Sequence, residues 1–173
     1  MMIISAMFMW WLSTSNNHST NAPTEEPLEL LPDFTAKLLH QELYDQQGNL
    51  QQEVFSQSME HYSELSLTHF KQPEFIIFQD GTPYWRLSAN TGTLHEGALI
   101  LDDNVVMLQI VDNTLVNKIS TQYIEIDLIN NIVNSDQPIL IEGKNVFIQG
   151  QGLTADLNQG SIQLTNHVQT RIQ

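Results

Sequence analysis

The amino-acid sequence predicts an all-β protein whose strands form one antiparallel sheet, folded over so that hairpins stack on each other. Short apolar alternations fill the chain from Phe34 onward, and turn residues separate them about every ten residues. No window of about eleven residues beyond the N-terminal run has the apolar spacing of a helix. A unit that occurs three times adds an internal repeat. A sandwich, a jelly roll and a solenoid all share these features, and the length of the repeat favours the folded-over sheet.

The repeated unit begins at Leu94, Leu128 and Leu157, where the sequence reads LHEGALILDDNVVM, LINNIVNSDQPILI and LNQGSIQLTNHVQT. Each unit reaches Gly or Asn three residues later, and both residue types accept the positive φ of a tight turn. Apolar residues two apart then follow on both sides of a polar break, which indicates a turn, a strand, a kink and a second strand. The turn residues are Gly97, Asn131 and Gly160, and the breaks fall at Asp103, Gln137 and Asn166. One unit cannot cover its own apolar face, so neighbours must stack. Three ordinary hairpins of a β domain would show the same turn chemistry.

Further strands are predicted on both sides of turn sequences. Asp-Gly at Asp80 and Gly81 is the strongest short hairpin signal in the chain. A second turn of hairpin type runs from Asp45 to Gly48. The expected strands are Phe34–Tyr44, Leu50–Tyr62, Phe75–Phe78, Tyr84–Ala89, Tyr123–Leu128 and Val146–Gln149, the last of which ends in a bend at Gly150 and Gly152.

Composition restricts the possible partners. The chain has 173 residues, enough for one domain and an appendage, and its formal net charge is −14. Such a charge repels nucleic acid, so no nucleic-acid partner is expected. The absence of cysteine excludes disulfides, thiolate metal sites and a lipid-attachment cysteine.

The N-terminal segment predicts contact with a membrane. Residues 1–12 are uncharged and apolar and contain Trp10 and Trp11, a residue type typical of membrane interfaces. The run is shorter than the roughly 20 apolar residues of a full span, and no basic residue precedes it. We therefore expect either a start further upstream or the outer part of an anchor whose basic flank is missing here. We expect an uncleaved anchor over 1–12, a flexible polar tether over 13–32 and a folded β domain over 33–173. A cleaved signal peptide and a buried apolar terminus stay open as alternatives.

Catalytic motifs are not found. The six histidines lack the spacing that places two metal ligands on one helix face, and neither a P-loop nor a Gly-x-Ser-x-Gly motif occurs. We therefore expect no catalytic residues, no metal and no cofactor, so the protein is not expected to be an enzyme. One alternative is a β-solenoid module that binds or processes polysaccharide through Tyr84, Trp85 and surface carboxylates.

The inward face of the predicted sheet is the most informative feature. Either it is a closed hydrophobic core, or it is a groove left open between two sheet halves that accepts acyl chains. Burial gains about 0.8 kcal/mol per methylene and needs no charge match, which suits an acidic protein that handles a phosphorylated lipid. The residues expected to line this lipid-binding groove are Phe75, Ile77, Trp85, Leu87, Leu99, Leu101, Val105, Met107, Ile124, Ile126, Ile139 and Ile141.

The order of several segments resembles one known family. The segments LYDQQGNL, SMEHYSELSLTHFKQPEFIIF, DGTPYWRLSANTGTL, ALILDDNVVML and LIEGKNVFIQGQGL occur in this order between Phe34 and Ile172. They resemble the LptC family, the bitopic subunits of the bacterial lipopolysaccharide export complex. The resemblance implies an OstA-like β-jelly roll or β-taco domain in the periplasm, preceded by an N-terminal transmembrane helix in the inner membrane.

The resemblance also implies partners. Lipopolysaccharide would arrive from the ATP-driven LptB, LptF and LptG core at the N-terminal edge, and LptA would receive it at the C-terminal edge, with the lipid A acyl chains in the apolar interior. Family positions used at partners or turns match Gly48, Phe70 and Gly143. The implied partner edge strand, Ser161 to Ile172, contains Ile162, Leu164, Val168 and Ile172. A soluble bridge protein of the LptA type remains an alternative. A strand at the end of a folded-over sheet also has unpaired N–H and C=O groups that a partner strand can satisfy.

Overall fold

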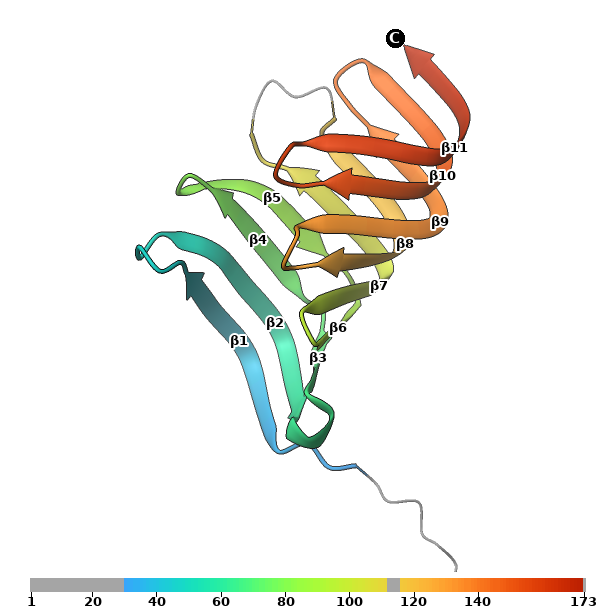
Figure 1. Ribbon diagram of the computed structural model, residues 1–173. Coiled ribbons are helices and arrows are strands. Elements are labelled where there is room, and N and C mark those ends of the chain that lie inside the picture. The colour runs from blue at the N-terminus through green and yellow to red at the C-terminus, as the bar shows by residue number, and fades with distance from the viewer. Residues whose placement is uncertain (1–29, 112–115, 173) are drawn as a thin grey trace, which may run out of the picture. The chain divides into compact units, whose positions relative to one another are not determined.

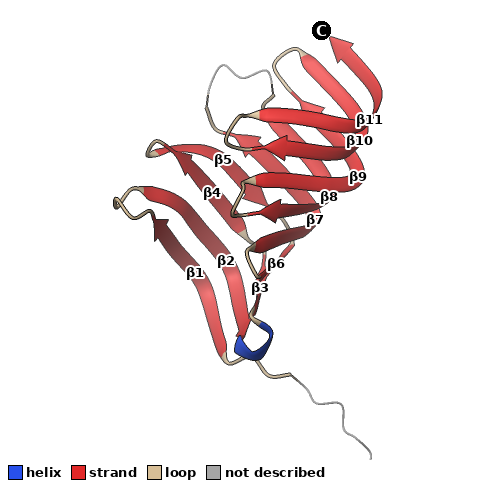
Figure 2. Cartoon of the chain, viewed as in Figure 1, coloured by secondary structure: helices blue, strands red, loops and turns tan. Residues whose placement is uncertain are grey.

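The structure, a computed structural model, describes residues 30–111 and 116–172, and the part from Leu31 onward forms one compact unit. Strands make up almost all of it, with a single turn of 3-10 helix (Figures 1 and 2). The elements are β1 (Phe34–Tyr44), β2 (Leu50–Tyr62), η1 (Ser63–Leu65), β3 (Leu67–Lys71), β4 (Glu74–Gln79), β5 (Thr82–Ser88), β6 (Thr91–His95), β7 (Ala98–Gln109), β8 (Lys118–Asp127), β9 (Ile132–Glu142), β10 (Val146–Asp156) and β11 (Ser161–Ile172). The all-β antiparallel fold predicted from the sequence is confirmed.

The sheet is an antiparallel meander. Two of its strands are interrupted by a bend, so each consists of two short strands, β3 with β4 and β5 with β6. The first half of β2 pairs with β4 and its second half pairs with β3. In the same way β7 pairs with β6 through its first half and with β5 through its second half. Thus β3 with β4, and β5 with β6, act as single bent strands, and from β1 to β11 each strand lies beside the next one in the chain.

The bends line up across neighbouring strands and fold the sheet over. Gln72 and Asp103 have positive φ angles of 49° and 63° at the bends of β3/β4 and of β7. Backbone hydrogen bonds connect these bends, because the Gln72 N–H donates to the Asn90 carbonyl and the Asn90 N–H donates to the Asp103 carbonyl, both at 2.8 Å. An added Cβ at Gly92 would lie 3.0 Å from Pro73 Cγ and 3.1 Å from Leu101 Cδ2, so the absence of a side chain at Gly92 eases the close packing here.

The later polar breaks of the repeat coincide with irregular pairing. The register between β9 and β10 shifts next to Gln137, between Gln151 and Leu153, where Gly152 has φ +76°. The register between β10 and β11 shifts at Gln149/Gly150, close to Asn166. Gly150 and Gly152 therefore form a bend, as predicted. The strand that was expected to end there continues to Asp156, because the kink interrupts the register without ending the pairing.

The turns of the repeat stack as predicted. Gly97, Asn131 and Gly160 all have positive φ, at 83°, 57° and 64°. The Leu128 N–H donates to the Gly97 carbonyl and the Leu157 N–H donates to the Asn131 carbonyl, each at 3.0 Å, so each turn is hydrogen-bonded to the next. The three units are therefore successive layers of one structure.

The structure contains two strands that the sequence did not predict, and it does not describe the N-terminal segment. The short strands β3 and β6 were not predicted, because each is half of a bent strand and is too short to show a period of two clearly. The expected anchor at 1–12, and the tether up to residue 29, lie outside the described residues. Among the residues that are described, no helix has the length and apolar character needed to cross a membrane.

Candidate functional site

The predicted lining residues do gather between the two halves of the sheet. All twelve lie in or against one hydrophobic cluster, and every one except Ile77 is buried, with an exposed fraction of 4% or less. Val54, Ile119, Val133 and Leu153 also belong to this interior and were missed by the sequence interpretation. The lining side chains pack against each other in the described structure. Of the two alternatives left open by the sequence, this packing resembles a closed core, and the binding of acyl chains between the two halves stays a prediction.

A pocket at the interior lies on the side of the sheet opposite the bends. This pocket of about 420 Å³ lies between the start of β2 and the β4–β5 hairpin on one lip and the β8–β9 and β10–β11 turns on the other. We call this pocket the slot. Its volume falls in the range of about 300–1,000 Å³ that is usual for small-ligand pockets. The slot is lined by Gln51, Gln52, Ile77, Phe78, Gln79, Tyr84, Ile126, Leu128, Ile129, Asn131, Leu157 and Asn158.

The slot combines an apolar floor with a polar, uncharged rim. Ile126 is buried at its base, and Leu128 and Leu157, the first residues of two repeat units, pack beside it. The amides of Asn131 and Asn158 are tied together on the rim, because Asn131 Nδ2 donates to Asn158 Oδ1 at 3.2 Å. A cavity of this kind fits an amphipathic ligand whose apolar part enters while its polar part stays at the rim. The position of Leu128 and Leu157 in the repeat was the signal that could have placed them here.

Tyr84 brings the two lips close together. It projects from β5 toward the β10–β11 turn, where its hydroxyl oxygen lies 3.4 Å from the position that a Cβ on Gly160 would occupy. The neighbouring Trp85 points into the interior, and its indole Nε1 is buried without a hydrogen-bond partner among the described residues. A buried N–H without a partner costs free energy, so the Trp85 indole contributes less to stability than a fully hydrogen-bonded one would.

The aromatic pair does not support a polysaccharide site. The Tyr84 and Trp85 rings are nearly perpendicular, at 84°, and Trp85 is 3% exposed. A sugar-binding platform needs exposed, coplanar rings, which these two residues do not provide in the described structure.

Both ends of the sheet are unpaired within the described chain. β1 pairs with β2, and β11 pairs with β10, while every strand between them has neighbours on both sides. Unpaired N–H and C=O groups at a sheet edge accept an added strand. The sequence-based expectation that neighbouring sheets dock at both ends stays a prediction.

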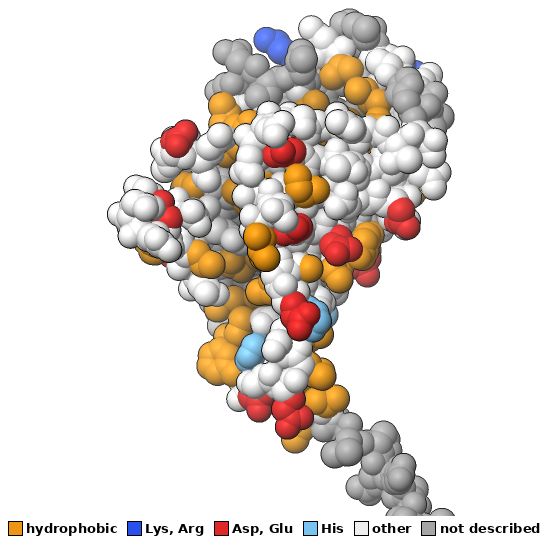
Figure 3. Space-filling view, viewed as in Figure 1, with side chains coloured by type: hydrophobic (Ala, Val, Ile, Leu, Met, Phe, Trp, Pro, Cys, Tyr) orange, Lys and Arg blue, Asp and Glu red, His pale blue; other side chains and the backbone are white. Residues whose placement is uncertain are grey.

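The edge at β1 is unusually apolar. Phe34 is 56% exposed and Leu38, which has a positive φ of 54°, is 83% exposed. Figure 3 shows hydrophobic side chains gathered beside β1 toward the lower end of the folded unit. Contiguous exposed apolar side chains are typical of interaction surfaces. The sequence interpretation assigned a partner to this edge but did not identify these residues.

Of the positions matched to the family, two lie in turns and one is buried in the core. Gly48, with φ +86°, ends the β1–β2 turn, and the Gly143 N–H donates to the Val146 carbonyl in the β9–β10 turn. Phe70 is buried in β3 and packs edge-to-face on Phe75. In β11, Ile162 and Leu164 pack against the core from the inward side. The side chains of Val168 and Ile172 lie outside the described part of the structure.

Aspartates hold the turns at the slot. Asp127 Oδ1 accepts hydrogen bonds from the Ile129 and Asn130 backbone N–H groups, at 2.9 and 3.0 Å, and Asn130 Nδ2 donates to Oδ2 at 2.6 Å. These donors favour the ionised carboxylate and lower the pKa of Asp127 from its ordinary value of 3.8, with the Asn130 side chain as the largest cause. Asp156 repeats the backbone pattern one unit later, accepting from Asn158 and Gln159.

Comparisons with known proteins agree with this architecture. The family model described as "Lipopolysaccharide-assembly, LptC-related" matches residues 1–173. The lipopolysaccharide export system protein LptC of Haemophilus influenzae is 24% identical over 177 residues, which cover 88% of this chain and 85% of that protein. The protein of the same name from Escherichia coli K12 is 25% identical over 130 residues, covering 74% of this chain and 68% of its own length.

A solved structure shows the same fold. The crystal structure of LptH from Pseudomonas aeruginosa, described as the LptA-homologous periplasmic component of a lipopolysaccharide transport device, superimposes with a TM-score of 0.50. It is 14% identical and covers 66% of this chain and 82% of its own. At this identity the likeness concerns the fold.

The folded-over sheet, its apolar interior and its unpaired edges define a class of β proteins that can take up an apolar ligand and extend by strand addition. Within that class, this chain belongs to the LptC-related family of lipopolysaccharide assembly. It takes part in lipopolysaccharide transport, and the family is a non-enzymatic one whose members act in the periplasm, anchored to the inner membrane.

Proposed function

We propose that this chain accepts lipopolysaccharide from the ATP-driven transporter core at the β1 edge and passes it to an LptA-type bridge protein at the β11 edge. The observation that carries the proposal is an apolar interior, with a lateral opening, that runs between two unpaired edges of one sheet. Strand addition at both edges would give a continuous, open-ended assembly in which each interior meets the next.

The acyl chains of lipid A are proposed to lie among the twelve lining residues. Because these side chains are packed in the described state, the lips must separate for lipid to enter, and Ile77 and Leu128 at the slot are the first contacts. Each methylene that leaves water gains about 0.8 kcal/mol, which offsets the packing that is lost when the interior opens. The phosphorylated sugars would stay at the amide-rich rim, where Asn131 and Asn158 offer neutral hydrogen-bond donors.

Site-specific photocrosslinking in membranes that contain lipopolysaccharide tests the proposed ligand site. A photoreactive residue at Ile77 or Leu128 should form a lipopolysaccharide adduct. The same residue at Glu125 or Thr154, exposed on the outward face of β8 and β10, should not form it. Equal labelling of the inward and outward positions would contradict an internal lipid path.

Residues 1–12 are proposed to anchor the domain, with 13–32 as the tether. The proposal is supported by the uncharged apolar sequence and by the inner-membrane anchoring of the family. N-terminal sequencing of the protein isolated from membranes distinguishes this form from a soluble bridge. Retention of residues 1–12 is expected, and a mature N-terminus beyond Leu12 would favour the soluble alternative.

A further inference from the structure

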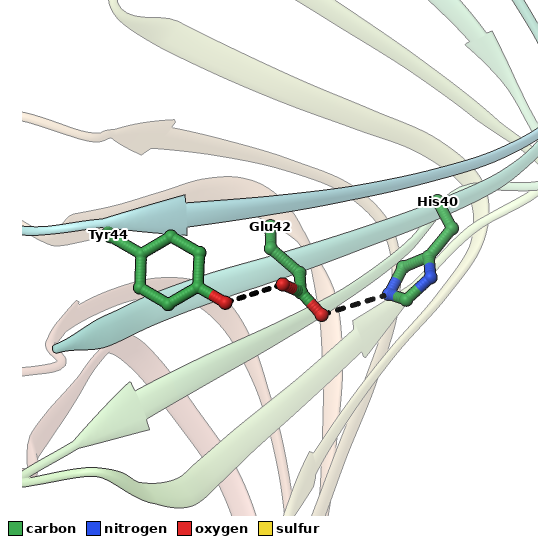
Figure 4. Close-up of polar contacts among 3 residues, drawn as sticks. All are labelled: His40, Glu42 and Tyr44. Carbon is green, nitrogen blue, oxygen red and sulfur yellow. Dashed lines mark hydrogen bonds and ion pairs between the residues drawn. The ribbon is translucent and has the colours of Figure 1, made fainter. Parts of the chain in front are cut away.

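A cluster of metal-ligating side chains lies on the outward face of the N-terminal hairpin, away from the slot. His40 and Glu42 are two residues apart on β1 and therefore share one face of the strand (Figure 4). Glu53 on β2 is the direct cross-strand partner of Glu42. One ligand atom from each of these three residues lies within 4.8 Å of the other two. The strand pairing thus assembles one imidazole and two carboxylates at a single point.

The pairing of Glu42 with Glu53 is unfavourable without a cation. Like charges directly opposite each other on neighbouring strands repel and destabilise the pair. The chain already carries a net charge of −14, which adds to the negative field around these carboxylates. A bound divalent cation would neutralise both carboxylates and convert their repulsion into a cross-strand connection.

The surrounding side chains orient two of the ligands. The His40 ring stacks on Phe55 of β2, with ring centroids 4.4 Å apart and an interplanar angle of 12°. This stacking leaves His40 Nε2 at 3.9 Å from Glu42 Oε1. The Tyr44 hydroxyl donates to the other carboxylate oxygen, Glu42 Oε2, at 2.5 Å. Figure 4 shows that Glu42 lies between the two rings, so one of its oxygens is held by Tyr44 while the other faces His40.

The hydrogen bond from Tyr44 is of the kind that supports metal ligands. The Tyr44 hydroxyl donates to one Glu42 oxygen and leaves the other oxygen directed at His40. Outer partners of this type fix the direction of a ligand, and their loss typically weakens metal binding by about 10–100-fold.

We propose that His40, Glu42 and Glu53 bind a divalent transition-metal ion of the Zn²⁺ class. A mixed nitrogen and oxygen set of three protein ligands fits zinc with water in the open position, whereas Mg²⁺ and Ca²⁺ prefer sets of oxygen ligands. Zinc bonds of about 2.0–2.2 Å require the three ligand atoms to approach each other by roughly 1–1.5 Å, which rotation of the exposed side chains allows. The ion would clamp β1, an edge strand whose side chains are mostly exposed, onto β2.

Titration calorimetry of the full, tag-free chain with Zn²⁺ tests the site, and the absorption spectrum of bound Co²⁺ reports the ligand set. One ion per chain is expected. The substitutions His40→Ala, Glu42→Gln and Glu53→Gln should each weaken binding at least about tenfold, and Tyr44→Phe should weaken it by about tenfold through the outer hydrogen bond. In the wild type alone, saturating Zn²⁺ should also raise the unfolding temperature.

Two matched controls separate this site from general binding to acidic residues and histidines. Glu60 likewise accepts a hydrogen bond from a tyrosine two residues away, Tyr62, at 3.1 Å, and His95 is exposed beside Glu96. Glu60→Gln and His95→Ala should bind Zn²⁺ as tightly as the wild type. The proposal is overturned if the wild-type chain takes up no Zn²⁺, or if His40→Ala and Glu53→Gln keep wild-type affinity. Circular dichroism spectra confirm that each variant is folded.

Discussion

At the scale of single residues, aspartates and positive-φ positions decide where the chain reverses. Asp127 and Asp156 each accept two backbone N–H groups from the residues that follow them, and Asp45 does the same at the β1–β2 turn. Such side chains replace the backbone acceptors that a turn lacks. Because two of these turns form one lip of the slot, residues that determine the fold also shape the candidate site.

The pKa of Asp127 leads to a prediction about stability at acid pH. Its folded-state pKa is below the ordinary 3.8, so the unfolded chain binds more protons in the acid range. The stabilisation is therefore fully present above about pH 4–5 and is lost as the pH falls through the folded-state pKa. Asp127→Ala should lower the denaturation midpoint at neutral pH and should make the decline between neutral and acid pH shallower than in the wild type.

Denaturant unfolding at several pH values checks this expectation. Asp136→Asn is the matched control, because Asp136 is exposed and its contact in the described structure is with the Gln137 side chain instead of a turn N–H. An Asp127→Ala variant with the acid profile of the wild type would show that the hydrogen-bonded turn does not contribute.

At the scale of elements, the two terminal strands differ from all the others. β1 and β11 each have one strand neighbour within the described residues, and β1 also exposes Phe34 and Leu38. β11 is held closely to β10, because an added Cβ at Gly150 would come within 2.8 Å of the Asn166 carbonyl oxygen. Both terminal strands are paired with their neighbour along almost their whole length, and the β1 edge differs by its exposed apolar side chains.

Cysteine crosslinking can separate the partners of the two edges. The chain has no cysteine of its own, so each introduced thiol is unique. In membranes that contain the complete transport system, Gln163→Cys in β11 should crosslink to the LptA-type bridge protein and Lys37→Cys in β1 to the transporter core. Both residues are exposed.

A position away from both edges of the sheet provides the control for the crosslinking. Glu125→Cys, exposed on the face of the central strand β8, should give neither adduct above background. Crosslinking of the bridge protein from β1, or of the transporter core from β11, would reverse the proposed direction of transfer.

At the scale of the whole folded unit, the aligned bends convert a meander into two facing layers. The apolar faces of both layers are buried against each other, and the slot opens at the side opposite the bends. The proposed entry of lipid must then compete with a packed interior. Because Tyr84 lies close to Gly160 at the slot, the two lips must move apart there for lipid to enter.

Trp85 can report lipid entry. The chain has three tryptophans, so Trp10→Phe and Trp11→Phe leave Trp85 as the single emitter. Spin-labelled lipid A should quench its fluorescence, because the acyl chains would replace the side chains that now surround the indole. Steady-state fluorescence on titration with the labelled lipid measures the effect.

A displaced tryptophan provides the control for quenching. In a Trp85→Phe and Tyr123→Trp variant of the same background, the indole would stand on the outward face of β8, at a half-buried position. Quenching there should be much weaker. Stronger quenching outside than inside would contradict an internal acyl site.

The repeat was predictable from sequence because its signals are local. Turn chemistry at Gly97, Asn131 and Gly160, the alternation around them and the break at Asp103 depend on φ preferences and on the period of a strand, both of which can be read within a few residues. The inward-facing residues were predictable for the same reason. The halves β3 and β6 were not, because a strand of five residues with a bend at one end has no distinct period.

The sequence by itself determined the all-β class, the turns, the polar breaks and the inward direction of the twelve predicted lining residues, since these follow from the conformational preferences of neighbouring residues. Only the tertiary structure decided how far the two layers close on each other, where the slot remains, and that Glu53 meets His40 and Glu42. Those outcomes depend on register and on packing between residues far apart in the chain, and a linear pattern does not specify either.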